Sequence, residues 1–212
     1  MSGVFVVGTD TGVGKTTVSI AIIRGLRARG LRVAAMKPCE TGDGDDALRL
    51  REASGLNLPA SDLNPYRFSR PAAPSIAARA EGQSISLAQI GSAYERIRTQ
   101  ADFTLVEGAG GLLVPFTNEE TTVELIQALS LPILVVARTA LGTINHSLLT
   151  LEVARSRGLR VLGIIFSRID PEADLGESEV IATIERLGNV RSLGVLAAHA
   201  DTGLDLDAIA GA

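Results

Sequence analysis

The sequence predicts an α/β fold with a mostly parallel central sheet and helices on both of its faces. Short apolar runs typical of buried strands alternate along the chain with segments of helical periodicity. That alternation implies right-handed crossover connections, which join parallel strands. Hydrophobic residues make up 46% of the chain but aromatic residues only 3%. The core must therefore be built from Val, Ile, Leu and Ala, as suits strands that are covered on both faces.

The first half of the chain begins with a strand. Val4–Gly8 is a continuous apolar run, and a glycine-rich loop joins it to Lys15–Arg29, where apolar residues recur at helical spacing. Leu31–Met36 is the next apolar run and the second predicted strand. A polar stretch then leads to a short predicted helix at Asp46–Ala53. The segment Asn57–Gly82 is rich in Pro, Ala and Ser and favours neither helix nor strand.

The second half repeats the rhythm of amphipathic segments and apolar runs. The predicted helices are Ser86–Thr99, Thr121–Leu129, Asn145–Arg157 and Glu177–Leu187. The predicted strands are Phe103–Val106, Ile133–Ala137, Val161–Phe166 and Ser192–Leu196. No internal repeat, low-complexity block or linker interrupts the pattern, so we expect residues 1–212 to form a single domain.

Composition narrows the setting and the partners. A net charge of −4 argues against nucleic acid or an anionic membrane surface as the main partner. No apolar run approaches the roughly 20 residues that a transmembrane helix needs, and the first residues lack the basic and apolar regions of a signal peptide. The single cysteine, Cys39, excludes an intramolecular disulfide and fits a reducing compartment. We therefore expect a cytoplasmic protein whose main partner is neither nucleic acid nor a membrane.

The stretch "GTDTGVGKTT", Gly8–Thr17, follows the first predicted strand and is similar to a phosphate-binding loop. The common spacing of such loops is G-x-x-x-x-G-K-[ST]. Counted back from Gly14, this spacing places Thr9 where the first glycine belongs, and Gly8 lies one position earlier. The loop is either a longer variant or a match in its glycine–lysine end only, and its spacing alone does not decide between them.

The end of this loop has what a nucleoside triphosphate requires. Glycines let the backbone curl so that several N–H groups point at phosphate oxygens, and the start of the following helix adds its dipole. Lys15 would reach the outer phosphates and the hydroxyl of Thr16 would bind Mg²⁺. The alternative is a glycine-rich turn without a ligand, but the strand–loop–helix order favours a P-loop NTPase-like domain. The expected phosphate-binding residues are Gly12, Val13, Gly14, Lys15, Thr16 and Thr17.

Acidic side chains occur where a metal ion would be held. Glu107 ends the predicted strand in "DFTLVEGAGG", at the edge of the sheet where ligands bind in such folds. A carboxylate there is typical of Mg²⁺ binding, and the alternative is a solvated acid that opens a turn. Asp45 and Asp46 are a second acidic candidate, although "DGDD" alone is more typical of a helix-capping loop. The expected nucleotide contacts around the glycines of this edge are Glu107, Gly108, Ala109 and Gly110.

Lys37 follows the second predicted strand and has two interpretations. Beside a triphosphate, its ammonium could neutralise the charge that develops during group transfer. Equally, it could be a surface lysine whose stem packs on the protein while its ammonium reaches water. Nearby Cys39 has no evident partner base, so we expect a small residue next to the site and not a nucleophile.

Taken together, five stretches resemble the dethiobiotin synthetase family. They are "GTDTGVGKT" (Gly8–Thr16), "KPCETG" (Lys37–Gly42), "NPYRFSRPAAPSIAA" (Asn64–Ala78), "VEGAGGLLVP" (Val106–Pro115) and "LGTINHSLLT" (Leu141–Thr150). They occur in the order of the family, from the first predicted strand to the fifth predicted helix. The loop of this family is one residue longer than the common form, G-x-x-x-x-x-G-K-T, which makes Gly8 its first glycine.

The resemblance implies an ATP-dependent ring closure, the penultimate step of biotin biosynthesis. CO₂ adds to one amine of 7,8-diaminopelargonic acid, and the resulting carbamate takes the γ-phosphoryl group of ATP. The second amine attacks the carbonyl carbon of this mixed anhydride, phosphate leaves, and the cyclic urea of dethiobiotin remains. The resemblance further implies Mg²⁺ as cofactor, ATP as co-substrate, and Lys15, Lys37 and Thr11 as catalytic residues.

Matched position by position, the resemblance also implies the ligand sets. Mg²⁺ would bind Thr16, Asp46 and Glu107, and Asp46 fits the register of the family better than Asp45. The Asn64–Ala78 stretch becomes a loop on the substrate side. The implied substrate-binding residues are Thr11, Lys37, Thr41, Thr143, Ile144 and Asn145. In this family Thr143, Ile144 and Asn145 would come from the neighbouring subunit of a homodimer.

At the base-binding positions the sequence departs from the family. Some members place Asn after the strand that ends at Phe166, and many have an aromatic residue or proline after the last strand. Here the corresponding nucleotide-binding positions are Ser167, Arg168, Leu196, Ala197 and Ala198. The preferred base is therefore left open, and a nucleoside triphosphate other than ATP could serve.

Two other functions are compatible with this fold. A partition-type ATPase typically has lysine early in the loop, where this chain has Asp10, and the sequence offers no basic DNA-binding face. A regulatory module that only binds nucleotide would need neither Lys37 with Thr41 nor the Thr143–Asn145 helix start. These residues favour the ligase over both alternatives.

Overall fold

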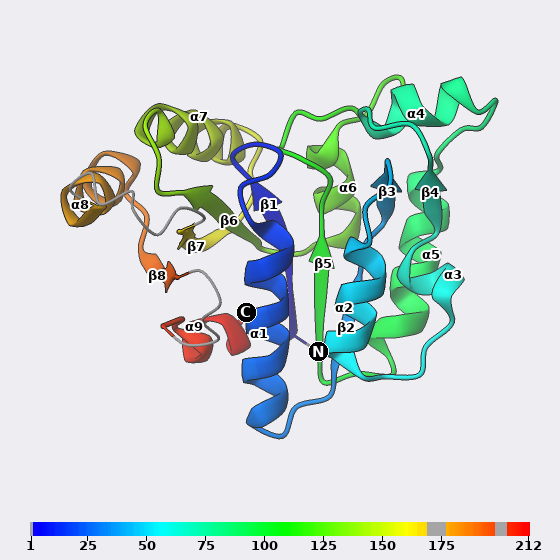
Figure 1. The fold of residues 1–212 in the computed structure, drawn as a ribbon, viewed down its shortest axis with the longest axis horizontal. Coiled ribbons are helices and arrows are strands. Elements are labelled where there is room, and N and C mark those ends of the chain that lie inside the picture. Colours follow the sequence, from blue (N-terminus) through cyan, green and yellow to red (C-terminus); the bar gives the residue numbers. More distant parts are fainter. Residues whose placement is uncertain (1, 169–176, 198–202) are drawn as a thin grey trace.

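Six parallel strands form the central sheet of the computed structural model, which describes residues 2–168, 177–197 and 203–212. Their order is β2-β5-β1-β6-β7-β8, and each neighbouring pair is parallel (Figure 1). The predicted α/β fold is confirmed. A second sheet pairs β3 (Cys39–Thr41) with β4 (Tyr66–Phe68) in parallel. The strands of the central sheet are β1 Ser2–Gly8, β2 Val33–Met36, β5 Phe103–Glu107, β6 Ile133–Arg138, β7 Val161–Ser167 and β8 Ser192–Leu196.

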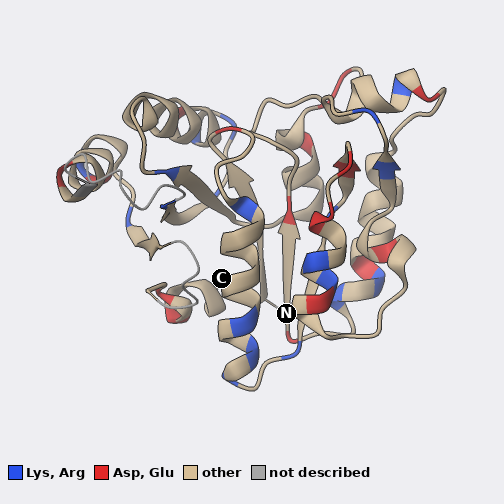
Figure 2. Cartoon of the chain, in the orientation of Figure 1, with Lys and Arg blue, Asp and Glu red and all other residues tan. Residues whose placement is uncertain are grey.

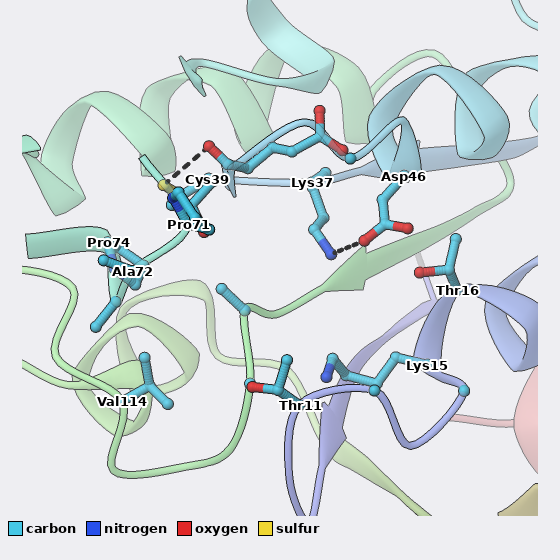
Figure 3. A pocket seen from close by; sticks show the side chains of 18 of the residues that line it. Thr11, Lys15, Thr16, Lys37, Cys39, Asp46, Pro71, Ala72, Pro74 and Val114 are labelled. Atoms are coloured by element: carbon cyan, nitrogen blue, oxygen red, sulfur yellow. Dashed lines mark hydrogen bonds and ion pairs between the residues drawn. The ribbon is translucent and has the colours of Figure 1, made fainter. Parts of the chain in front are cut away.

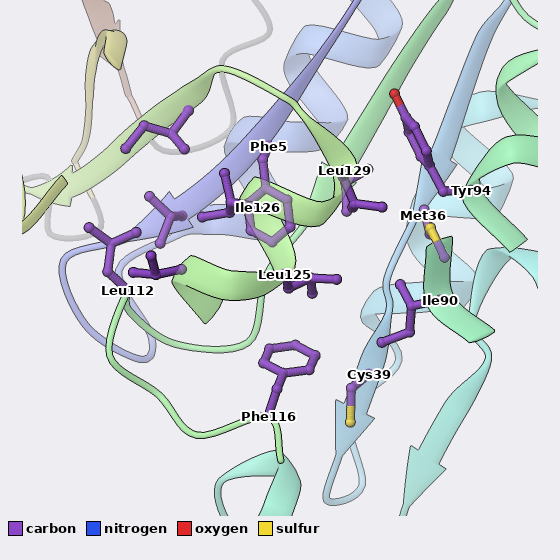
Figure 4. Packing of buried hydrophobic residues seen from close by; sticks show 14 of the residues in the cluster. Phe5, Met36, Cys39, Ile90, Tyr94, Leu112, Phe116, Leu125, Ile126 and Leu129 are labelled. Atoms are coloured by element: carbon purple, nitrogen blue, oxygen red, sulfur yellow. The ribbon is translucent and has the colours of Figure 1, made fainter. Parts of the chain in front are cut away.

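Helices cover both faces of the central sheet. Apolar side chains of α1, α2 and α9 pack on one face with Val4 and Val6 of β1, whereas those of α5, α6, α7 and α8 pack on the other face with Phe5 and Val7. This alternation is the two-residue period of a strand that is buried on both sides. Figure 4 shows Phe5 of β1 and Ile126 of α6 among the apolar side chains that pack on this second face. The helices are α1 Lys15–Ala28, α2 Asp46–Ser54, α3 Ala60–Leu63, α4 Pro74–Ala80, α5 Leu87–Arg98, α6 Thr122–Leu129, α7 Thr143–Ser156, α8 Glu177–Gly188 and α9 Leu206–Ala210.

Helix starts follow their capping residues. Helix α6 begins one residue later than predicted, because Thr121 is its N-cap and donates its backbone N–H to Glu124 Oε2 at 2.7 Å. In return, the side chain of Thr121 accepts from the backbone of the first helical turn. Together the two contacts form a capping box, which satisfies two N–H groups at the helix start. Helix α7 begins at Thr143, two residues earlier than predicted, because Gly142 adopts φ 91° and acts as N-cap. Glycine reaches that left-handed backbone conformation without steric cost.

The least regular part of the prediction, Asn57–Gly82, contains three short elements, α3, β4 and α4. None of these was predicted, and neither were β3 and α9. Each is three to seven residues long, too short for a hydrophobic period to appear. Contacts across the chain hold them instead: the N–H of Gly42 donates to Phe68 O at 2.9 Å and that of Lys37 to Leu63 O at 2.8 Å.

Charged residues are distributed over the helices with both signs (Figure 2). Along α2, for example, Asp46 is followed by Arg49, Arg51 and Glu52.

None of the helices in the described ranges is long and apolar enough to cross a membrane.

The register of the central sheet brings three predicted site elements to one edge. Met36 of β2 pairs with Val106 of β5, so the next residues, Lys37 and Glu107, are neighbours beyond that pair. On its other side β5 pairs with β1, and Val6 lies opposite Glu107. Since β1 continues into the glycine loop, the loop, the lysine and the carboxylate meet at the carboxyl ends of the strands, where parallel sheets bind ligands.

Candidate active site

A cavity of about 720 Å³ opens at this edge of the sheet. The glycine loop forms one wall, and Pro71–Pro74 with Val114 form a largely apolar wall. In Figure 3 the side chains of Lys37 and Asp46 point toward each other from one side of the cavity, and Lys15 and Thr16 project from the other. The cavity thus has a charged end at the loop and an apolar end away from it.

The loop has the longer form, with Gly8 as its first glycine. A Cβ at Gly8 would lie 2.6 Å from Asp10 O and 3.0 Å from Lys15 Nζ, so this position admits only glycine without rearrangement. The N–H of Gly8 donates to Gly110 O at 3.2 Å. Gly14 has a φ of 92° and leads directly into α1. A left-handed glycine there lets consecutive N–H groups turn toward one point in front of the helix.

The ammonium of Lys15 lies inside the loop, where its Nζ donates to Asp10 O at 3.2 Å. Burial strips water from this ammonium, and Lys37 adds repulsion. Together they lower the pKa of Lys15 from 10.5 to about 8, against the attraction of Glu107 and Asp46. Anionic phosphate oxygens would restore the charge of this group.

Lys37 is not a surface lysine, because only 4% of it is exposed. Its Nζ donates to Glu107 Oε1 at 2.6 Å and to Asp46 Oδ2 at 2.9 Å. Burial opposes the charge of this ammonium, but the two carboxylates outweigh it and raise the pKa of Lys37. A buried cation that stays charged is thereby fixed beside the glycine loop.

Three oxygen-bearing side chains gather next to Lys37. The hydroxyl of Thr16 donates to Glu107 Oε1 at 2.9 Å. The other oxygen of this fully buried carboxylate, Oε2, has no hydrogen-bond partner among the described residues. Although burial acts in the opposite direction, the charge and hydrogen bond of Lys37 and a hydrogen bond from Thr16 lower the pKa of Asp46. Asp45 instead lies at the surface, 4.0 Å from Arg49.

This donor set fits Mg²⁺. The ion takes oxygen ligands and is usually held by one or two carboxylates, with waters and substrate phosphates completing its shell. The unpaired oxygen of Glu107, the hydroxyl of Thr16 and the ionised Asp46 could supply such ligands. Among the described residues no three His, Cys, Asp or Glu side chains cluster as a metal site.

The remaining predicted residues of this region lie around the cavity. Thr11, Gly12, Gly14, Thr16, Thr17, Thr41, Ala109 and Gly110 line it, while Val13 and Glu107 are fully buried outside its wall and Gly108 is also buried. Cys39 lines it as well, and burial raises the pKa of its thiol to about 12. Such a thiol is inert as a nucleophile at neutral pH, in agreement with the expectation from sequence.

Two predicted groups lie apart from this cavity. Thr143–Asn145 form the first turn of α7, where Thr143 is buried and Asn145 is exposed, and none of the three lines the cavity. At the ends of β7 and β8 the N–H of Arg168 donates to Leu196 O at 2.9 Å. Ser167 is buried there and Ala197 half-buried. Ala198 lies outside the described residues.

Some residues of the cavity were missed by the sequence reasoning. Glu40 and Arg49 both line it, whereas Pro71–Pro74, which also line it, belong to the Asn64–Ala78 stretch that was expected on the substrate side. Arg49 lies three positions after Asp46 on α2, so its helical spacing could have indicated the shared face. Glu40 had no such local signal, because its partners lie 7 and 27 residues further along the chain.

The loop, the buried carboxylate beside it and the parallel sheet define a nucleoside triphosphate-binding protein of the P-loop class. The family model described as "AAA domain" matches residues 2–203. The fold is similar to the MinC:MinD cell division protein complex of Aquifex aeolicus, with a TM-score of 0.59 and 16% identity over 93% of this chain and 81% of that one. FtsY of Mycoplasma mycoides gives a TM-score of 0.59 and 16% identity over 99% and 66% of the two chains.

Sequence relatives narrow this class. The ATP-dependent dethiobiotin synthetase BioD of Anaeromyxobacter dehalogenans strain 2CP-C is 48% identical over 200 residues, which are 92% of this chain and 90% of that protein. The protein of the same name from Methanococcus vannielii is 38% identical over 96% of this chain and 97% of its own length. The chain belongs to the dethiobiotin synthetase family, as its five motifs predicted.

Proposed function

We propose that the chain is an ATP-dependent ligase that converts 7,8-diaminopelargonic acid and CO₂ into dethiobiotin. The observation that carries the proposal is the buried Lys37 ammonium, which is held by Glu107 and Asp46 and lines one cavity together with the glycine loop. A protein that only binds nucleotide needs the loop but not a second buried cation opposite it. Membership of the family and the apolar far wall of the cavity, suited to an aliphatic chain, support the same function.

The reaction requires that two anions approach each other. One amine of the substrate attacks CO₂ and loses a proton, which gives a carbamate. A carbamate oxygen then attacks the γ-phosphorus of ATP, the bond to ADP breaks, and a mixed anhydride forms. The ammonium groups of Lys15 and Lys37 would offset the repulsion between carbamate and phosphate. The hydroxyls of Thr11 and Thr41, both in the cavity wall, would donate to the carbamate.

Ring closure completes the sequence without a covalent bond to the protein. The second amine attacks the carbonyl carbon, the bond to the phosphate oxygen breaks, and phosphate leaves with the electron pair while the amine loses a proton. The raised pKa of Lys37 keeps its ammonium charged as this negative charge develops. Preorganised cations in a water-poor site cost no reorganisation during the reaction, which is why electrostatic stabilisation is expected to supply most of the rate.

Mg²⁺ would be held by Thr16, Asp46 and Glu107. When bound, it supplies charge neutralisation for the outer phosphates of ATP. The fit rests on the unpaired Oε2 of Glu107 and on the lowered pKa of Asp46, which keeps that carboxylate ionised.

The distant carboxylate of the substrate would bind the start of α7 from a neighbouring subunit. Thr143–Asn145 do not line the cavity of their own chain, so a second copy would have to deliver them. Next to them Leu141 is 92% exposed, as expected of an apolar side chain that a partner covers. We therefore propose a homodimer with shared active sites, built from one P-loop domain per chain. The cytoplasmic setting and the preferred base stay predictions from sequence.

Product detection tests the proposed function. Purified protein is mixed with 7,8-diaminopelargonate, ¹³C-bicarbonate, Mg²⁺ and ATP, and dethiobiotin is sought by mass spectrometry. We expect product that carries one ¹³C and that depends on diamine, bicarbonate and nucleotide together. Parallel reactions with CTP and GTP measure the base preference. Nucleotide binding without product for any nucleotide would contradict the proposal and favour the regulatory module.

A further inference from the structure

The second sheet contains an ion pair with a buried carboxylate that the proposed reaction does not use. Strands β3 and β4 are three residues each, and Glu40 lies directly opposite Arg67. A pair of strands this short is not stable by itself. Both oxygens of Glu40 have partners: Oε2 accepts from Arg67 Nη1, and Oε1 accepts from the N–H of Ala47 at 3.2 Å. The Glu40 carboxylate therefore joins β3 both to β4 and to the start of α2.

The contact to Ala47 replaces a missing helix cap. Ala47 is the second residue of α2, and its N–H has no acceptor within the helix. Asp45, at the N-cap position, makes no side-chain cap hydrogen bond. Glu40 supplies the acceptor from outside, and its negative charge also suits the positive end of the helix.

Arg67 holds the other side of the same turn. While its Nη1 binds Glu40, its Nη2 donates to Gly44 O at 2.8 Å. Gly44 and Ala47 flank Asp46, whose Oδ2 lies 2.9 Å from Lys37 Nζ. The ion pair thus fixes the backbone before and after Asp46.

We infer that Glu40 and Arg67 form a positioning clamp, which holds Asp46 against Lys37 and the glycine loop. Neither clamp residue is assigned a chemical step. The inference rests on the proposed function only for its effect on turnover. Because a misplacement of about 1 Å in a reacting site can cost about 100-fold in rate, the position of Asp46 would be felt in catalysis. Arg67 also neutralises Glu40, which would otherwise add an unpaired buried charge to the wall of a cavity that receives polyanions.

The chain provides a matched control in another ion pair, Arg96–Asp62. The side chain of Arg96 is 55% exposed and that of Arg67 is 53% exposed, and their carboxylate partners are 11% and 2% exposed, respectively. Arg96 belongs to α5 and Asp62 to α3, and neither residue lines the cavity. A purely structural role for Arg67 predicts similar consequences for Arg67→Gln and Arg96→Gln.

The test compares Arg67→Gln, Glu40→Gln, the double variant and Arg96→Gln. Steady-state kcat and KM are measured, together with hydrogen–deuterium exchange of residues 43–50 in the free protein. We expect Arg67→Gln to lower kcat/KM by about 10- to 30-fold, because the Asp46 turn loosens and Glu40 is left unpaired. The double variant is expected to be less impaired than Arg67→Gln, since the unpaired charge is gone. Arg96→Gln should stay within about twofold of the wild type.

Hydrogen–deuterium exchange tests the clamp independently of the reaction. Residues 43–50 should exchange faster in Arg67→Gln than in the wild type and in Arg96→Gln, whatever the chain catalyses. If the wild type makes no dethiobiotin, the proposed function fails, and the exchange result still decides the clamp. Equal exchange in all variants, or a loss of kcat/KM no larger than that of Arg96→Gln, would overturn the inference.

Discussion

Two buried glutamates near the cavity differ in how their oxygens are used. Glu107 is fully buried at the end of β5, and one of its oxygens accepts from Lys37 and Thr16. The other oxygen has no partner within the described part of the chain. Glu40, on β3, is also buried, but both of its oxygens have partners.

This difference distinguishes a carboxylate that binds a ligand from one that positions the protein. Buried polar atoms are almost always hydrogen-bonded, because an unpaired one costs about 1–3 kcal/mol. The unpaired oxygen of Glu107 is therefore accounted for if a ligand binds there. Both oxygens of Glu40 are used within the protein, where they join β3 to β4 and to the start of α2.

Loss of Lys37 should have the largest effect on turnover. Lys37→Ala is expected to lower kcat by about 1,000-fold, because the charge opposite the loop is lost, while nucleotide affinity changes by less than about threefold. Equilibrium binding and single-turnover product formation measure the two effects separately. Unfolding by heat serves as control, since two carboxylates left without their cation should destabilise the fold by about 3–5 kcal/mol. Normal turnover in this variant would refute the assigned role.

Gly8→Ala should lower nucleotide affinity by about 100-fold. The new Cβ would lie 2.6 Å from Asp10 O and 2.9 Å from Val13 Cγ2, so the loop must distort, and with it the N–H groups aimed at phosphate. Calorimetric titration with ADP measures the loss. Gly91→Ala is the control, because nothing lies within 4 Å of a Cβ there. If Thr9→Gly restored binding to Gly8→Ala, the loop would have the common spacing and not the longer one.

The two neighbouring aspartates should differ clearly. Asp46→Asn is expected to lower kcat/KM by about 30-fold, since it weakens the pair with Lys37 and removes an ionised oxygen. Asp45→Asn, at the exposed N-cap position, should stay within about twofold. Equal losses in the two variants would show that Asp46 acts through the turn alone.

The smallest predicted effect is a pH dependence of nucleotide binding. The folded-state pKa of Lys15 is lowered to about 8, so its ammonium loses its proton as the pH rises through 8. Nucleotide affinity should then fall by up to about tenfold per pH unit above 8. Between pH 8 and 10.5, Lys15 is protonated in the unfolded chain but increasingly neutral in the folded one. The free energy of unfolding should therefore rise with pH over this range, because a charged Lys15 no longer has to be buried. Lys15→Arg, which stays charged, should show a flat binding profile; an equal slope there would contradict this origin.

The sequence predicted the phosphate end of the cavity because its residues lie in local patterns. Gly8–Thr17 has fixed spacing, and Glu107 and Lys37 each end an apolar run whose strand register follows from the fold. The longer loop was ambiguous in spacing alone and was resolved by the resemblance to the family. Its steric basis is visible only in three dimensions: a Cβ at Gly8 would lie 2.6 Å from Asp10 O.

The second sheet could not be predicted for a physical reason. Cys39–Thr41 and Tyr66–Phe68 are too short to show a period, and each strand is defined only by the other, 27 residues away. Glu40 therefore looked like an ordinary polar residue after Lys37-Pro38. The same lack of local signal left Asn57–Gly82 unassigned, although its Pro71–Pro74 segment forms a wall of the cavity.

The Mg²⁺ dependence of nucleotide affinity tests the central contrast between Glu107 and Glu40 most directly. ATP binding is measured with and without Mg²⁺, in the absence of diamine, for the wild type, Glu107→Gln and Glu40→Gln. If the unpaired oxygen of Glu107 is a metal ligand, Mg²⁺ should tighten binding in the wild type and in Glu40→Gln but hardly at all in Glu107→Gln. A full Mg²⁺ effect in Glu107→Gln, or a loss in Glu40→Gln as complete as the one expected for Glu107→Gln, would contradict the roles given to the two carboxylates.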